Sequence, residues 1–174
     1  MKPMPFQTTA TRLWKSLTPE ERLRAASAFF TEPPPELAAA AVGALVKARH
    51  LRPQAARALA PDAQARMLAT VLDPGEPLAQ GLLVGLHLAE RRPLLGAFLD
   101  ALRLPHEDGI LKEEADTAPP VDAAGARAAL GALAAFPAAE VRTYLNTLWL
   151  QDPERWQVLA GLYSPLAEET QSSG

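Results

Sequence analysis

Apolar side chains recur every three or four positions along most of the chain, and prolines separate the stretches in which they do so. This spacing is typical of amphipathic helices, and proline is tolerated in the first turn of a helix but breaks its interior. Thr18-Pro19-Glu20-Glu21 has the pattern of a capping box, which predicts a helix that continues to about Phe30. The same signals predict helices over residues 36–50, 53–59, 61–72, 94–104, 122–136, 137–150 and 153–163, and a short one within 1–17.

The stretch 77–92 differs from these helices because it is apolar on nearly every face as far as Leu88. A helix of this kind is typically surrounded by others, so we predict that it is the central helix. Gly81 and Gly85 lie four residues apart and would let a neighbouring backbone come close, although each lowers helix stability by ~1 kcal/mol relative to Ala. The pattern also predicts that the following side chains are buried: Leu82, Leu83, Leu86, Phe98, Leu99, Leu102, Leu130 and Trp156.

Two further stretches are expected to contribute to the core. The helix over 36–50 has an apolar stripe at helical spacing, and the C-terminal part of the chain concentrates aromatic side chains. The aromatic residues either pack the last two helices together or anchor a partner protein, and we favour packing. The stripe comprises Leu37, Ala41, Ala44, Leu45 and Ala48, and the aromatic residues are Tyr144, Trp149, Trp156 and Tyr163.

The residue types favour an all-α fold. Ala and Leu dominate the apolar fraction, whereas Val is sparse and Ile occurs only at Ile110, so the β-branched residues that suit strands are largely missing. We predict a single domain of eight or nine short helices, arranged as an irregular bundle or a helical-repeat-like array, with the connection 105–120 on the surface. The expected division is an N-terminal segment with a short helix (1–17), an all-helical domain (18–163) and a flexible tail (164–174).

Composition restricts the classes of function and the cellular compartment that we expect for the protein. The 174 residues include no cysteine, which excludes disulfides, thiolate zinc sites, iron–sulfur clusters and cysteine nucleophiles. The N-terminus lacks the apolar region of a secretory signal, and no segment approaches the ~20 apolar residues of a membrane span, so we expect a cytoplasmic protein without membrane contact. An excess of Arg over Lys and a single Asn, Asn146, suggest a GC-rich bacterial genome.

One candidate site lies on the predicted central helix. His87 and Glu90 are one turn apart, the spacing of a His-x-x-Glu metal pair, and Arg91 follows them. Bundles that hold two metal ions need such a pair twice, and no second pair occurs. If Pro93 makes a tight turn, helix rise places His87 about 8 Å and His106 about 20 Å from it, too far apart to share a metal. We therefore expect no cofactor, and we treat these three residues as candidate polar lining of a cleft, with a structural His87 as the favoured interpretation.

A second candidate is the surface cluster formed by His106, Glu107 and Asp108. The three side chains are the sharpest chemical lead in the sequence, but Asp108 with Gly109 is also a favoured turn pair. A calcium-binding loop aligned on this glycine lacks three oxygen ligands. We therefore expect a solvated connection with a capping role and assign no catalytic residue, because the chain has no P-loop, dinucleotide-binding, nucleophile-elbow or zinc-protease signature either.

Charge is unevenly distributed although the net charge is only −3. A basic region over residues 47–66 contrasts with an acidic segment over 107–122, which has six carboxylates and one lysine. Nucleic-acid binding through the basic region is disfavoured because its cations lie on three predicted helices without interleaved aromatic residues. The basic residues of this region are Lys47, Arg49, His50, Arg52, Arg57 and Arg66.

These observations leave three hypotheses for function. The first is a protein–protein interaction or scaffold module that presents helix faces to a protein partner or to a second copy of itself. The second is a helical enzyme or small-molecule binder with a cleft near His87, Glu90 and Arg91. The third is nucleic-acid binding through residues 47–66.

Overall fold

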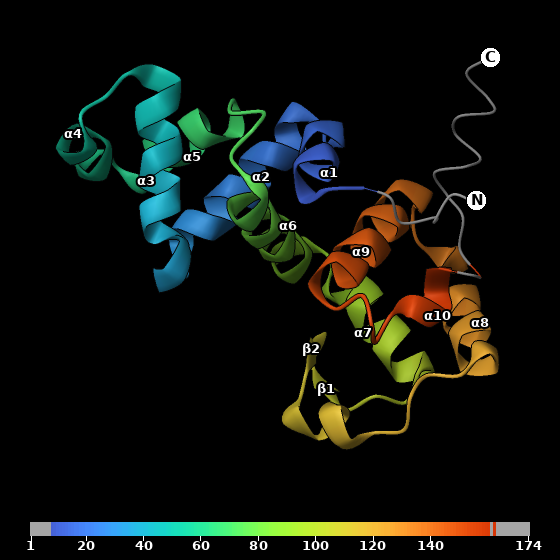
Figure 1. Ribbon diagram of the computed structural model, residues 1–174. Helices are drawn as coiled ribbons and strands as arrows, with labels where there is room; N and C mark the ends of the chain where they lie inside the picture. The colour runs from blue at the N-terminus through green and yellow to red at the C-terminus, as the bar shows by residue number, and fades with distance from the viewer. Residues whose placement is uncertain (1–7, 161, 163–174) are drawn as a thin grey trace, which may run out of the picture. The chain divides into compact units, whose positions relative to one another are not determined.

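Helices account for 72% of the residues that the structure describes, far above the roughly one-third that is typical of soluble proteins. The computed structural model describes residues 8–160 and Leu162 (Figure 1). That part of the chain contains ten α-helices, two 3₁₀ helices and one two-stranded antiparallel hairpin. The all-α class is therefore confirmed, and the hairpin and the two 3₁₀ helices are elements that were not predicted from the sequence.

The chain divides into two compact units, with the boundary between Glu90 and Arg91. The first unit comprises residues 9–90, drawn from blue to green in Figure 1, and the second begins at Arg91. The sequence analysis proposed no boundary at this position. The predicted tail from residue 164 lies outside the described residues.

Six helices form the first unit, and their starts follow the prolines. Proline occupies the first helical position of four of them, as its fixed φ and missing N–H favour. The predicted capping box is present, because Glu21 N–H donates to Thr18 Oγ1 and Thr18 N–H donates to Glu21 Oε1, both at 3.1 Å. The helices are α1 (Ala10–Ser16), α2 (Pro19–Thr31), α3 (Pro35–Arg49), α4 (Pro53–Ala58), α5 (Pro61–Ala69) and α6 (Glu76–Glu90).

Helix α6 is the central element of this unit, as predicted. It packs against α1, α2 and α3, and Leu82, Leu83 and Leu86 are fully buried. A Cβ at Gly85 would lie 3.9 Å from the backbone oxygen of Ala25 in α2, so a neighbouring backbone does come close to the glycine pair. Burial of this apolar helix stabilises the unit.

Glu76, at the start of α6, holds the N-terminus of α1. Its carboxylate accepts hydrogen bonds from the backbone N–H groups of Ala10 and Thr11, both at 2.9 Å, while Thr9 Oγ1 accepts from Arg12 N–H at 3.1 Å. All three first-turn N–H groups of α1 are thus satisfied. Burial alone would raise the pKa of Glu76, but the hydrogen bonds from residues 9–11 outweigh it and hold the pKa below its ordinary value of 4.5.

Glu76→Gln is expected to lower the free energy of unfolding by about 1 kcal/mol at pH 7, because an N-cap interaction of this kind is worth roughly that much. A lowered pKa in the folded state stabilises the fold above the unfolded value and ceases to do so as pH falls through the folded pKa. Urea unfolding of both proteins should therefore show a difference at pH 7 that shrinks below about pH 4.5. A difference that does not change with pH would contradict this assignment.

Two further side chains join α1 to the carboxyl end of α5. Trp14 is fully buried, and its Nε1–H donates to the carbonyl oxygen of Val71 at 2.8 Å. The Arg22 guanidinium donates to the carbonyl oxygens of Leu17, just after α1, and Ala69, in the last turn of α5. Cations are favoured at these carboxyl ends. Together the two side chains position the loop of residues 71–75.

The second unit contains four α-helices, a hairpin and two 3₁₀ helices. The helix predicted from Pro153 is shorter than expected, because residues 153–156 form turns and the helix begins at Gln157. The elements are α7 (Arg92–Ala101), β1 (His106–Glu107), β2 (Ile110–Leu111), η1 (Glu113–Thr117), α8 (Ala123–Ala132), η2 (Leu133–Ala135), α9 (Ala138–Gln151) and α10 (Gln157–Ala160).

Phe98 forms the core of this unit together with two aromatic residues from the C-terminal stretch. Its ring centroid lies 5.6 Å from those of Tyr144, edge-on, and Trp156, tilted, and all three side chains are buried. Burial also raises the pKa of the Tyr144 phenol. The predicted core role is thus confirmed for Tyr144 and Trp156, whereas Trp149 is partly exposed and Tyr163 lies outside the described residues.

Two predicted core residues, Leu102 and Leu130, are only half-buried. Leu102 would continue the buried face of α7, but this helix ends at Ala101 and leaves Leu102 as its C-cap. On α8 the buried positions are Ala126 and Ala129, followed by Leu133 in η2. Leu130 follows Ala129 by about 100° around the helix axis and so lies beside the buried face.

Candidate functional site

The His106-Glu107-Asp108 cluster belongs to a β-hairpin. His106 pairs with Leu111 and Glu107 pairs with Ile110, and the turn residues Asp108 and Gly109 both have positive φ, 49° and 90°. This is the backbone of a type I′ turn, for which Asp-Gly is a preferred pair. The predicted turn is therefore present, but the strands on either side of it were missed because each has only two residues.

One face of α7 holds the hairpin in place. Arg92 donates to the Asp108 carbonyl oxygen at 2.8 Å, and His106 Nε2 lies 2.6 Å from Asp100 Oδ1. A Cβ at Gly109 would come within 2.6 Å of Leu95 Cβ, so the turn backbone packs directly on the helix. Arg92, Leu95 and Asp100 fall within an arc of about 140° around the α7 axis, at 3.6 residues per turn, and thus lie on one side of the helix.

The hydrogen bonds of His106 determine its tautomer. Nδ1 accepts from the backbone N–H of Gly109 at 3.1 Å, so the neutral ring carries its proton on Nε2 and donates it to Asp100. Both ring nitrogens are occupied, and the side chain is only 13% exposed. His106 therefore stabilises the hairpin in this arrangement and offers no nitrogen to a substrate or metal.

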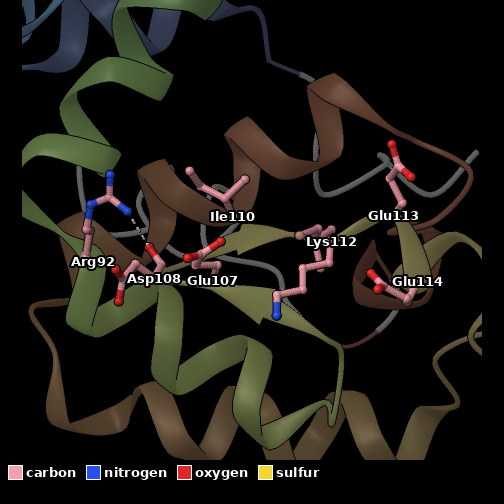
Figure 2. Close-up of a pocket in the computed structure, with 8 residues that line it drawn as sticks. Arg92, Glu107, Asp108, Ile110, Lys112, Glu113 and Glu114 are labelled. Atoms are coloured by element: carbon pink, nitrogen blue, oxygen red, sulfur yellow. Dashed lines mark hydrogen bonds between the residues drawn. The ribbon is translucent and has the colours of Figure 1, made fainter.

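A hollow of about 580 Å³ lies against the hairpin, and Figure 2 shows how charges line it. Glu107 and Asp108 lie at one end and Glu113 and Glu114 at the other, with Lys112 between them. Among the described residues, no group of three or more His, Cys, Asp or Glu side chains is arranged to hold a metal ion. The remaining lining residues are Arg92, Ile110 and Leu111.

The candidate lining His87, Glu90 and Arg91 extends across the boundary between the two units. His87 is buried near the end of α6, whereas Glu90 faces outward and pairs with Arg24 at 2.8 Å. Arg91 is buried in the second unit, 3.9 Å from Glu140. None of the three residues lines the hollows described in this section, and a cleft that they share stays a prediction.

A second hollow in the second unit, of about 410 Å³, surrounds Arg155. The Arg155 guanidinium pairs with Asp116 and lies 3.6 Å from Asp152. Two carboxylates therefore already neutralise its charge, which leaves little attraction for an anionic ligand.

The first unit has an apolar groove beside α3, which we call the α3 groove. Its volume is about 720 Å³, and one wall is the loop of residues 71–75 that Trp14 and Arg22 position. Leu72 in this loop is 49% exposed. The lining residues are Ala40, Gly43, Ala44, Lys47, Ala48, Val71, Asp73, Pro74 and Gly75.

The outer face of α3 is unusual for a helix in contact with solvent. Ala41, Ala44 and Leu45 of the predicted apolar stripe are buried, whereas Leu37 is half-buried and Ala48 is exposed. Exposed helix faces normally carry charged and polar side chains. Here the exposed positions between Glu36 and Lys47 are Ala38, Ala39, Ala40 and Gly43.

This face is not among the candidate sites predicted from the sequence. The available signal was an uncharged run from Leu37 to Val46, which fits a helix buried on several sides equally well. The basic residues of this region, His50 included, all prove to be exposed in the same unit, on α3, α4, α5 and the α3–α4 connection.

Comparison of the chain with protein-family models, curated protein sequences and solved structures finds no match, so relatives add nothing to this assignment of sites.

No helix within the described residues is long and apolar enough to cross a lipid bilayer.

Proposed function

We propose that the chain is a protein-interaction module that binds another polypeptide in the α3 groove. The observation that carries this proposal is the exposed, uncharged face of α3 beside an apolar hollow. An amphipathic helix laid into such a groove buries apolar surface on both partners. Small side chains on α3 allow a partner backbone to come close, and Val71 and Pro74 supply apolar contact on the opposite wall.

Gly43 supports the same proposal. Glycine within a helix costs ~1 kcal/mol relative to alanine, and its usual justification is the close approach of another part of the protein. A Cβ at Gly43 would lie more than 4 Å from every described atom outside the adjoining residues and turns of its own helix. The packing of the unit therefore does not require this glycine, whereas a partner in the groove would make use of the space.

Gly43→Met is expected to abolish binding in the α3 groove and leave the fold intact, because an added Cβ meets no neighbouring segment within 4 Å and the longer side chain occupies the space that a partner would take. The measurement is affinity capture from a lysate of the native source, with identification and quantification of bound proteins by mass spectrometry. Gly131→Met is the matched control, since Gly131 is also an exposed helical glycine with no neighbour within 4 Å.

We expect a polypeptide that the wild type and the control retain in near-stoichiometric amounts and that Gly43→Met loses at least tenfold. Identical sets of bound proteins for all three baits would contradict the proposal. A catalytic cleft near His87, Glu90 and Arg91, nucleic-acid binding through residues 47–66, a cytoplasmic location and a bacterial origin stay predictions from the sequence.

A further inference from the structure

We propose that the polypeptide bound in the α3 groove is α3 of a second copy of the chain, packed antiparallel about a two-fold axis. This inference rests on the proposed function and specifies its partner. The observation that carries the inference is a stripe of residues on the exposed face of α3, which we call the α3 stripe. The α3 stripe consists of Glu36, Ala39, Ala40, Gly43 and Lys47.

The α3 stripe lies on one side of the helix, because its members recur every three or four residues. All five are exposed. Opposite charges stand at its two ends, about 16 Å apart at 1.5 Å per residue, and the positions between them carry no charge. Neither Glu36 nor Lys47 forms an ion pair with any residue that the structure describes.

This arrangement of charge is complementary to itself when the helix direction is reversed. In an antiparallel pair, Glu36 of each copy lies opposite Lys47 of the other, and Ala40 lies opposite Gly43. A parallel pair in register would instead place Glu36 against Glu36 and Lys47 against Lys47, which repel each other. Two-fold symmetry uses the same surface on both copies and closes after two chains, as a self-complementary patch requires.

The α3 groove lies beside the Lys47 end of the α3 stripe, because Ala40, Gly43 and Lys47 belong to both. In the antiparallel pair, Ala39 and Ala40 of the partner copy would enter the hollow next to Val71. Alanine and glycine let the two helix axes approach more closely than larger side chains would.

Contact through one helix and one loop covers less surface than the roughly 800 Å² per partner of a standard stable interface. We therefore expect a dimer in reversible exchange with monomer at roughly tens of micromolar. The two ion pairs are exposed at the rim, so their main contribution is to the orientation of the helices and to the salt sensitivity of the dimer.

The test is sedimentation velocity of the full chain over a wide concentration range, with charge-reversed variants. The wild type is expected to dimerise, and Glu36→Lys and Lys47→Glu are each expected to stay monomeric, because each places like charges opposite one another at both ends. An equimolar mixture of the two variants should dimerise again. In the mixed pair, one copy carries two lysines and the other two glutamates at these positions, so both contacts become attractive.

Circular dichroism of every variant checks the fold. Glu20→Lys is the matched control, because Glu20 is exposed in the first turn of α2 as Glu36 is in the first turn of α3. Both substitutions place a cation near a helix N-terminus, at a similar cost in helix stability. Glu20→Lys should leave the dimer intact.

Three results would overturn the inference: a wild type that stays monomeric at all concentrations, a Glu36→Lys variant that still dimerises, or two folded variants whose mixture stays monomeric. A monomeric wild type that nevertheless captures another protein in a Gly43-dependent way would end the inference and leave the proposed function standing. Absence of both self-association and Gly43-dependent capture would end both.

Discussion

Phe98→Ala is expected to lower the free energy of unfolding of the second unit by about 3–5 kcal/mol, the range for aromatic-to-alanine substitutions in protein cores. The Phe98 side chain is fully buried in α7 and contacts Tyr144 of α9 and Trp156, which precedes α10. Its removal leaves a cavity, because the two neighbouring rings cannot both move into the space without breaking their own packing. It also removes two aromatic pairs.

Guanidinium chloride unfolding, followed by tryptophan fluorescence and by circular dichroism, measures the loss. Leu130→Ala is a suitable comparison, because Leu130 lies in the same unit and is half-buried. We expect Leu130→Ala to lower the free energy of unfolding by no more than about 2 kcal/mol. Equal losses for the two variants would show that Phe98 is not the centre of the core.

Gly109→Ala is expected to destabilise the hairpin by about 2–4 kcal/mol. A Cβ at this position would lie 2.6 Å from Leu95 Cβ and 3.0 Å from Leu95 Cδ2, and φ is +90°, where residues with side chains are strained. The strain costs about 1 kcal/mol and the overpacking a further 1–3 kcal/mol. The turn can relieve the clash only by moving away from α7, which breaks the Arg92 contact to Asp108 as well.

Gly75→Ala is the control that separates the two causes. Gly75 has almost the same backbone angle, with φ +92°, but nothing lies within 4 Å of an added Cβ. Thermal unfolding should show a larger loss of stability for Gly109→Ala than for Gly75→Ala. Amide hydrogen exchange of residues 106–111 should be faster in Gly109→Ala, with the faster exchange confined to the hairpin. If both substitutions cost the same, the contact with Leu95 contributes nothing and strain alone explains the effect.

The positions of most helices could be predicted because their signals are local. Proline restricts its own φ and lacks an N–H, so it marks the first turn of α2, α3, α4 and α5 whatever the rest of the chain does. The capping box at Thr18 and Glu21 likewise involves neighbouring residues only. Burial of Leu82, Leu83 and Leu86 followed from α6 being apolar on nearly every face, since any packing of such a helix covers it.

The contacts of polar side chains could not be predicted in this way. Glu76 caps a helix that begins 66 residues earlier, and Arg22 reaches the last turn of a helix 47 residues later. The hairpin depends on Asp100, Arg92 and Leu95, which α7 happens to place on one face. Two-residue strands have no period to detect, so only the Asp-Gly turn was visible.

The candidate site illustrates the same division. The amino-acid sequence alone determined that α3 is a helix with an uncharged run from Leu37 to Val46, mostly alanine and glycine, and opposite charges near its ends. The apolar stripe in the sequence already predicted that Ala41 and Leu45 face inward, but only the tertiary structure decided that Ala40 and Gly43 face a groove open to solvent. The reason is physical: helix formation depends on residues within one turn of each other, whereas exposure depends on which distant segments cover the helix, here α4, α5, α6 and the loop of residues 71–75.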